Sequence, residues 1–224
     1  KAKKVLNSNN IGALIMEVQR NEKPKKNFLQ TIRKLTKQKN IVLIFDECSS
    51  GFRQNFGGLH RIYKVDPDIA VYGKALGNGY PITAVVGSKE VMKNAKDTFI
   101  SSTFWTDRVG PVAALETLKV MKKVKSWKKI SKTGKLIKKK WKNLAKKHGL
   151  KISIKGIDAM PNFSINSSNW LKYKSYLIQE MLKKKYLVTN AVYCCIDHKN
   201  NILKGYFHEL DKIFKTLSRC EKGL

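Results

Sequence analysis

The chain has 224 residues, of which 42% are hydrophobic, so it is long enough and apolar enough to bury a core. It has no apolar run near the ~18 residues that a membrane span needs, no recognisable signal peptide and no CxxC pair among its four cysteines. We therefore expect no membrane association and a reduced, cytoplasmic location. The formal net charge is +30, and 40 of the 46 basic residues are lysine.

The excess of lysine leaves two readings open, a compositional bias or a surface for nucleic acid. Sequence-specific contacts to nucleic acid usually rely on the arginine fork, and the chain contains no nucleic-acid-binding motif. We therefore expect no specific nucleic-acid partner. Salt-sensitive binding to polyanions is still expected from such a charge.

The first half of the chain alternates between strand and helix patterns. Short apolar runs predict strands, and the helix is predicted by apolar residues at helical spacing, in this order: strand 11–18, helix 24–39, and strands 41–45, 69–72 and 84–86. Such alternation predicts an α/β fold with a mostly parallel sheet that is covered on both faces.

The second half begins with helical spacing over residues 111–148, which predicts one or two long helices with a solvated, lysine-rich face. The remaining pattern predicts strands at 150–154, 162–165 and 191–196 and helices at 170–184 and 208–217. The predicted domains are a partial large domain at 1–125, a connecting helix at 126–150 and a small α+β domain at 151–224.

Three features could carry chemistry. Asp46 and Glu47 follow a buried strand, where open α/β sheets bind ligands, although they could equally be turn or capping acids. Lys74 follows another strand among apolar and glycine neighbours, where desolvation would make its amine a nucleophile. Hydroxyls at 101–106 precede a predicted helix and could hold a phosphate or simply cap the helix.

Together these features resemble a known family. Residues 44–53 look like the aspartate segment of class III aminotransferases, 67–82 are similar to their lysine segment, and 102–111 resemble the segment that reaches a cofactor phosphate across a dimer interface. The resemblance extends from about Ile11 to the C-terminus and is nearest to the branch like glutamate-1-semialdehyde aminomutase. It implies fold type I and the cofactor pyridoxal 5'-phosphate.

The resemblance also implies roles for individual residues. Lys74 would be the catalytic Schiff-base lysine, and Asp46 would face the pyridine nitrogen of the cofactor. A carboxylate at that position stabilises the protonated ring by roughly 4 kcal/mol at an effective dielectric near 20. Thr103 would bind the phosphate of the partner subunit's cofactor, with Ser102 the weaker candidate. Glu17 matches an acid of the family near the site, and its role is left open.

The chain departs from the family pattern at several points. Ser49 stands where many relatives carry glutamine to contact the ring hydroxyl, and Val18 stands where many have proline. Family members are longer on the N-terminal side, where the other phosphate-binding loop lies. We therefore expect this chain to be the C-terminal part of such an enzyme and to bind the cofactor weakly or not at all by itself.

The resulting prediction is an aminotransferase or aminomutase that acts on a small amino donor and a carbonyl acceptor and forms a homodimer when complete. Two alternatives remain open: an inactive remnant of the fold, and a basic protein that binds polyanions. Near the site, Cys48 is interpreted as a small buried hydrophobic residue, and His60 as a loop residue rather than a base. No metal site is predicted.

Overall fold

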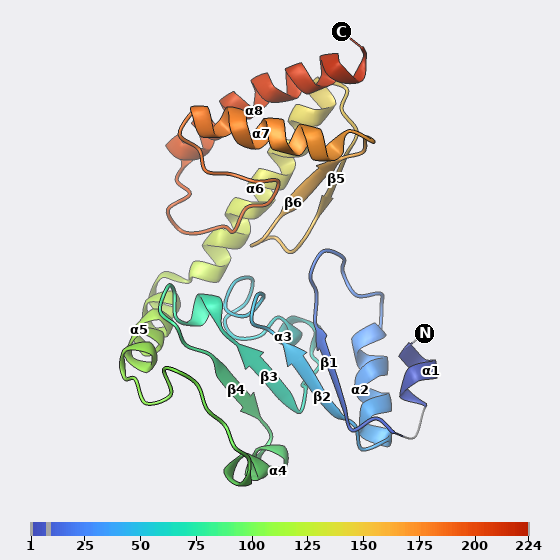
Figure 1. Cartoon of the computed structure of the whole chain (residues 1–224), viewed down its shortest axis with the longest axis vertical. Coiled ribbons are helices and arrows are strands. Elements are labelled where there is room, and N and C mark those ends of the chain that lie inside the picture. Colours follow the sequence, from blue (N-terminus) through green and yellow to red (C-terminus); the bar gives the residue numbers. More distant parts are fainter. Residues whose placement is uncertain (1, 8–9, 224) are drawn as a thin grey trace. The chain divides into compact units, whose positions relative to one another are not determined.

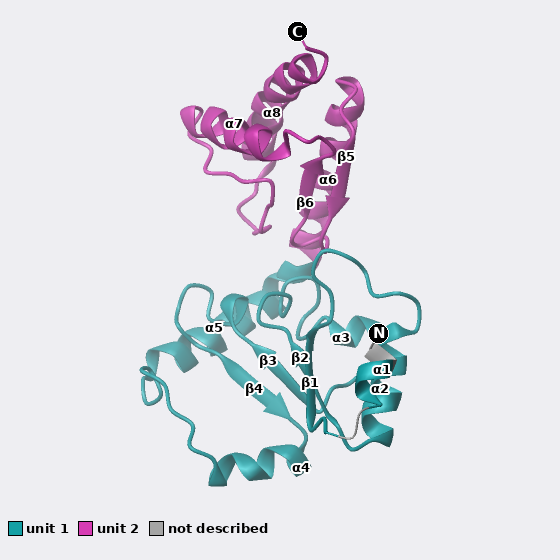
Figure 2. Cartoon of the chain, turned by 45° about the vertical axis from the view of Figure 1, so that its right-hand side comes forward, with its two compact units in different colours: residues 1–127 teal, residues 128–224 magenta. Residues whose placement is uncertain are grey.

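The structure is a computed structural model that describes residues 2–7 and 10–223 (Figure 1). The chain divides into two compact units, residues 1–127 and 128–224 (Figure 2). The division falls close to the start of a long helix, near the beginning of the connecting helix predicted at 126–150.

The N-terminal unit contains a sheet with short helices. Its elements in chain order are α1 (Ala2–Leu6), β1 (Ala13–Glu17), α2 (Phe28–Gln38), β2 (Val42–Asp46), α3 (His60–Tyr63), β3 (Ile69–Tyr72), the 3₁₀ helix η1 (Lys74–Leu76), β4 (Ala84–Gly87), α4 (Lys89–Met92), the 3₁₀ helix η2 (Lys93–Asp97) and α5 (Val109–Val124).

Helix α6 (Ser126–Lys147) leads into the C-terminal unit. That unit continues with β5 (Ile152–Lys155), β6 (Asn162–Ile165), α7 (Trp170–Lys183) and α8 (Asn200–Glu221).

The sheet of the N-terminal unit has the strand order β1-β2-β3-β4. The first three strands are parallel, and β4 runs antiparallel to β3, so the prediction of a mostly parallel sheet is confirmed. Leu43 and Phe45 of β2 are completely buried, as expected for a central strand covered on both sides.

The outer strands differ from the prediction of a sheet covered on both faces. Ile15 on β1 is 63% exposed, and Val85 on β4 is 53% exposed. Because strand side chains point to the faces of the sheet, these exposures show that the elements of residues 2–7 and 10–223 leave part of a face uncovered at both outer strands.

An ion pair ties α2 to the sheet. Arg33 donates two hydrogen bonds to the Asp68 carboxylate, at 2.7 and 3.0 Å, and Asp68 also accepts the backbone N–H of Leu43 at 2.8 Å. Burial alone would raise the pKa of Asp68, but these bonds and the charges of Arg33 and Lys37 outweigh burial and lower it. This contact lies at the start of β2, at the opposite end from Asp46.

The C-terminal unit packs α6, α7 and α8 with the antiparallel pair β5–β6. Its core centres on Trp141, Phe163 and Phe214, whose rings contact one another through Phe163. The indole N–H of Trp141 donates to the Tyr206 hydroxyl at 2.9 Å, so this buried nitrogen keeps a partner.

One prediction for the C-terminal unit is wrong, and a second gives a helix that is too short. Residues 191–196 do not form a strand, because only Ala191 bridges to β6 and Cys195 instead donates its backbone N–H to the His198 ring at 3.2 Å. The helix predicted at 208–217 is longer and runs over Asn200–Glu221. Lys199 stands before its first turn, and the buried face continues on both sides of the predicted segment.

Candidate functional site

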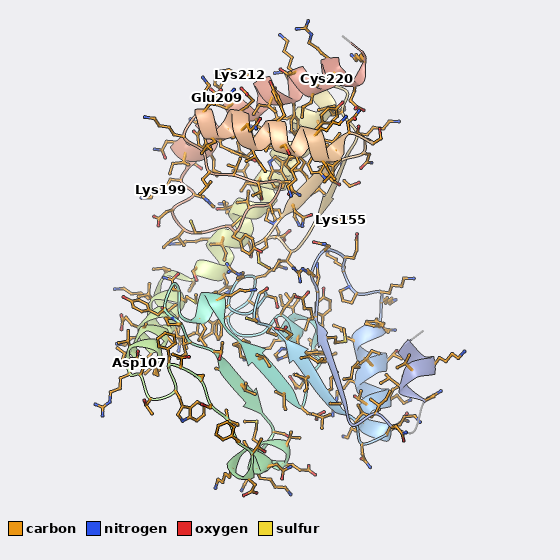
Figure 3. The ribbon with its side chains drawn as sticks, in the orientation of Figure 1. Asp107, Lys155, Lys199, Glu209, Lys212 and Cys220 are labelled. Atoms are coloured by element: carbon orange, nitrogen blue, oxygen red, sulfur yellow. The ribbon has the colours of Figure 1, made fainter. Side chains whose placement is uncertain are left out.

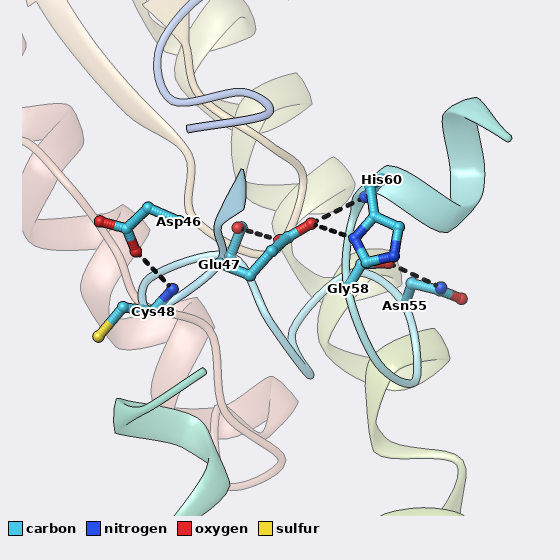
Figure 4. Close-up of polar contacts among 7 residues, drawn as sticks. Asp46, Glu47, Cys48, Asn55, Gly58 and His60 are labelled. Atoms are coloured by element: carbon cyan, nitrogen blue, oxygen red, sulfur yellow. Dashed lines mark hydrogen bonds and ion pairs between the residues drawn. The ribbon is translucent and has the colours of Figure 1, made fainter. Parts of the chain in front are cut away.

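The first part of the candidate site is the turn that follows β2. Successive side chains of a strand point to opposite faces, so Asp46 and Glu47 diverge where β2 ends. Figure 4 shows the two carboxylates on opposite sides of the chain. Asp46 is half-buried, and its Oδ1 accepts the backbone N–H of Cys48 at 2.9 Å. This bond fixes the carboxylate locally and leaves its other oxygen for a further partner.

Glu47 is completely buried and points into the protein. Its Oε1 accepts the backbone N–H of His60 at 2.8 Å and contacts the His60 ring Nδ1 at 3.0 Å, while its other oxygen accepts the Ser50 hydroxyl. Burial alone would raise the pKa of Glu47, but bonds from the His60 ring, Ser50 and the backbone of His60 and Leu59 outweigh burial and lower it. Glu47 is therefore a buried anion held by donors.

Lys74 lies in the neighbouring segment, directly after β3. Its backbone has φ = 45°, a left-handed conformation that costs a non-glycine residue energy and is found disproportionately at functional sites. The amine donates to the Ser49 hydroxyl. The Lys74 side chain is exposed, so the desolvation expected from its apolar neighbours is not seen in this chain.

Glycine at position 73 is favoured by the close approach of the two segments. A Cβ on Gly73 would lie 2.9 Å from the Cys48 sulfur, closer than side chains pack. Cys48 is half-buried in this contact, between the turn after β2 and the start of η1. The small residue thus lets the Lys74 segment lie directly against the turn that carries Asp46.

Sheet topology explains why these residues meet. Strands β2 and β3 are parallel neighbours, and Asp46 pairs in register with Val71, three residues before Lys74. Asp46 and Lys74 therefore both follow the carboxyl ends of adjacent strands, where open α/β sheets bind ligands. Ser49 links the two segments through its bond to Lys74.

Glu17 ends β1 and pairs in register with Asp46, so it lies at the same edge of the sheet. Its carboxylate forms an ion pair with Arg20 at 3.1 Å. The structure thus places a third acid at this edge, and its role in the chemistry stays open.

The segment before α5 carries the predicted phosphate ligand. Thr103 and Ser102 are exposed, and Thr103 begins the turn at residues 103–106. Asp107, which Figure 3 labels, accepts the backbone N–H of Val109 at 2.8 Å and so caps α5. Among the described residues, no hydrogen bond joins Thr103 to Asp46 or Lys74. Its role stays a prediction.

The interpretation of His60 as a loop residue is wrong. His60 begins α3, is buried and contacts the carboxylate of Glu47. The two residues are 13 positions apart, and no periodic pattern joins them. The one local hint of this contact was the presence of a second carboxylate, Glu47, directly after Asp46, with no basic residue nearby in the sequence to pair with it.

A cavity of about 410 Å³ lies away from these residues, within the C-terminal unit. Its lining is mainly apolar and includes Ile137, Leu203 and Tyr206, together with His198. Burial lowers the pKa of His198, although the charge of Asp197 opposes the shift. None of the residues predicted for the site lines this cavity.

In the part of the chain that the structure describes, no group of three or more histidine, cysteine or acidic side chains is arranged to hold a metal ion. No helix in these residues is both long enough and apolar enough to cross a membrane.

Comparison with curated proteins identifies similar sequences. The 3-aminobutyryl-CoA aminotransferase of Cloacimonas acidaminovorans is 33% identical over 152 residues, which cover 67% of this chain and 37% of that protein. The glutamate-1-semialdehyde 2,1-aminomutase of Thermodesulfovibrio yellowstonii is 31% identical over 211 residues, which cover 87% of this chain and 49% of that protein. The chain thus spans about half the length of such relatives, or less.

Solved structures show the same fold. The FumI protein of Sphingopyxis sp. MTA144, solved with pyridoxal phosphate, has a TM-score of 0.88 at 22% identity and covers 100% of this chain and 56% of its own. The ornithine aminotransferase of Toxoplasma gondii has a TM-score of 0.83 at 21% identity, with 99% and 55% covered. The predicted fold class, that of pyridoxal-phosphate-dependent transferases of fold type I, is confirmed.

The sequence match extends beyond individual relatives. The family profile described as aminotransferase class-III matches residues 2–191, which include all three motifs. The chain therefore belongs to the class-III aminotransferase family.

Proposed function

We propose that the protein to which this chain belongs is a pyridoxal-phosphate-dependent enzyme. It transfers an amino group from a small amino donor to a carbonyl acceptor, or moves one within a molecule. The observation that carries the proposal is the position of Asp46 and Lys74 at the carboxyl ends of adjacent parallel strands: Asp46 pairs in register with Val71, and Lys74 donates to Ser49 in the turn that follows Asp46. Family membership supports the same reaction class.

The side chains at this edge fit the groups that the cofactor presents. A carboxylate with one oxygen held by Cys48 suits a protonated ring nitrogen, and a primary amine suits an aldehyde carbon. The Ser49 hydroxyl can orient the amine or contact a ring oxygen. When bound, the cofactor supplies an electron-withdrawing ring that stabilises negative charge at the reacting carbon.

Each residue then has a defined task. Asp46 holds a proton on the ring nitrogen through its carboxylate, which favours the positive form of the ring. Lys74 binds the cofactor through Nζ and moves a proton at that atom to or from the substrate. Ser49 holds the amine in place by its hydrogen bond. These tasks require the Lys74 amine and the Asp46 carboxylate to face the same bound cofactor. The register of β2 and β3 is compatible with this, because it brings both residues to the same edge of the sheet.

The proposal also covers the binding of the cofactor phosphate, the oligomeric state and the location of the complete protein. Thr103 would bind the phosphate of a cofactor held mainly by a second subunit, so the complete protein would be a homodimer. Its exposed position before α5 supports this arrangement. We also place the enzyme in the cytoplasm, as its cysteine usage suggests.

Reductive trapping tests the role of Lys74 directly. The chain is incubated with pyridoxal phosphate, reduced with borohydride and mapped by peptide mass spectrometry. Because reduction accumulates product, weak binding is also detected. We expect Lys74 to be modified about tenfold more than Lys89 and Lys128, two exposed lysines that report nonspecific reaction, which corresponds to about 1.4 kcal/mol.

Asp46→Asn is the matched variant, because it keeps the shape of the side chain and removes its charge. We expect it to lower the preference for Lys74 without changing the reaction of Lys89. Equal modification of Lys74 and the reference lysines at every cofactor concentration, both in the unsubstituted chain and in the longer protein to which it belongs, would overturn the proposed site.

A further inference from the structure

Glu47 is adjacent to Asp46, yet the proposed reaction gives it no task. A carboxylate that is completely buried is costly unless donors surround it. The donors to Glu47 are the backbone N–H of His60 at 2.8 Å, the His60 ring at 3.0 Å, the Ser50 hydroxyl and the backbone of Leu59. Such complete satisfaction of a buried charge indicates that its position is held tightly.

These bonds close a loop. They join Glu47, at the start of the turn after β2, to His60, at the start of α3. Further bonds inside the loop, from Phe52 N–H to the Gly57 carbonyl at 2.8 Å and from Asn55 to the Gly58 carbonyl at 3.1 Å, keep it compact. We call the contacts of Glu47 with His60 and Ser50 the anchor of this loop, and Figure 4 shows that Glu47 and His60 lie on the side of the chain away from the Asp46 carboxylate.

The residues of the proposed site lie at the anchored end of this loop. Cys48 fixes the Asp46 carboxylate through its backbone N–H, and Ser49 accepts the bond from Lys74. Both stand between Glu47 and Ser50, whose side chains are bonded to each other. The turn therefore cannot shift without breaking a bond to the buried carboxylate.

We propose that Glu47 and His60 are positioning residues, which hold the Asp46–Ser49 turn so that the carboxylate and the amine of the site stay in place. This inference rests on the proposed function. The ring Nδ1 of His60 acts as a hydrogen-bond donor, and the neutral ring suffices when Nδ1 carries its proton. The other groups that face the carboxylate are Ser50 and, more remotely, Tyr72.

The structure offers a matched set of variants. His60→Asn keeps a donor at nearly the position of Nδ1, whereas His60→Leu fills similar space without a donor. Arg33→Leu breaks a different, half-buried contact of the same unit, the pair with Asp68, at the far end of β2. It therefore controls for a general loss of stability.

Two measurements are made on each variant below its unfolding temperature. The first is the preference of pyridoxal phosphate for Lys74 over Lys89 after borohydride reduction. The second is the alkylation rate of Cys48 by iodoacetamide, compared with the exposed Cys195 and Cys220, which reports the order of the turn without the cofactor.

We expect His60→Leu to lower the Lys74 preference about tenfold and to raise the Cys48 rate several-fold. His60→Asn should restore both values to within about twofold of the unsubstituted chain. Arg33→Leu should lower the unfolding temperature and change neither value.

The outcomes separate this inference from the proposed function. An unchanged Lys74 preference in His60→Leu, or an equal loss in Arg33→Leu, would overturn the positioning role. Absence of any Lys74 preference, both in the unsubstituted chain and in the longer protein to which it belongs, would refute the proposed function instead. In that case the alkylation rate of Cys48 alone tests the positioning role. Equal rates in the unsubstituted chain and His60→Leu would show that the contacts of Glu47 with His60 do not hold the turn.

Discussion

At the scale of single residues, two neighbouring carboxylates have opposite environments. Asp46 is half-buried and accepts the backbone N–H of Cys48 through one oxygen, whereas Glu47 is completely buried and both of its oxygens accept hydrogen bonds. The difference follows from the strand, because adjacent side chains point to opposite faces. Two consecutive acidic residues thus fit different proposed roles, Asp46 as a ligand of the cofactor and Glu47 as a positioning residue.

The lowered pKa of Glu47 predicts how stability depends on pH. Because the pKa is lower in the folded state than in the unfolded chain, the contribution of Glu47 to stability is complete above the ordinary glutamate range. It is lost as the pH falls through that range to the lowered value. We expect Glu47→Gln to be less stable at neutral pH by about 2 kcal/mol and to lack this part of the acid dependence.

Urea unfolding over a series of pH values measures this effect. Asp68 and Asp211 also have lowered pKa values and give the unsubstituted chain acid dependence of the same sign, so the difference between the two curves is the relevant quantity. Parallel curves for the chain and Glu47→Gln would contradict the prediction.

At the scale of elements, the packing of α6 depends on a glycine that lets the helix approach the backbone of a neighbouring turn. On α6, a Cβ at Gly134 would lie 1.6 Å from the backbone oxygen of Asp158, in the turn between β5 and β6. Lys138, one turn further, donates to the carbonyl of Gly156 at 2.7 Å and to Asp158 at 3.1 Å. Helix α6 therefore packs directly against the backbone of the turn between β5 and β6, and this backbone cannot move aside as a flexible side chain can.

Gly134→Ala tests this contact. In a free helix, alanine would be favoured over glycine by about 1 kcal/mol. Here the clash should cost more than that gain, since overpacking costs typically about 1–3 kcal/mol. We expect lower stability of the C-terminal unit, measured by amide hydrogen exchange in β5 and β6. Lys139→Ala, an exposed change on the same helix, serves as the control; equal or slower exchange in Gly134→Ala would refute the argument.

At the scale of the whole molecule, the net charge of +30 is the dominant property. Ion pairs neutralise some lysines locally; on α8, for example, Lys212 bonds Glu209 at 2.9 Å (Figure 3). Many other lysines are exposed, among them Lys139, Lys140 and Lys142 on α6. The surface should therefore attract polyanions without any built recognition site.

Salt titration tests this view. We expect binding to duplex DNA to weaken linearly on a log–log plot against salt concentration and to show no preference for sequence. Replacing Lys139, Lys140 and Lys142 with glutamate should reduce the slope, because fewer counterions are released. A sequence preference that persists at physiological salt would favour a dedicated nucleic-acid function instead.

Much of the fold followed from local patterns. The apolar runs at 41–45 and 69–72 predict strands because they are short, continuous and rich in β-branched residues, and they correspond to β2 at Val42–Asp46 and β3 at Ile69–Tyr72. The order of the three motifs indicated the family, and the family placed Lys74 and Asp46 in a common site, which stays a prediction.

What the sequence by itself determined is most of the longer strands and helices, the fold class and the family, because these depend on local apolar periodicity and on contiguous motifs. The tertiary structure alone decided that His60 donates to Glu47, that Gly73 lies against Cys48 and that residues 191–196 form no strand. The physical reason is that these contacts join residues remote in the chain, and hydrogen bonds and close approaches of this kind leave no periodic trace in a single sequence.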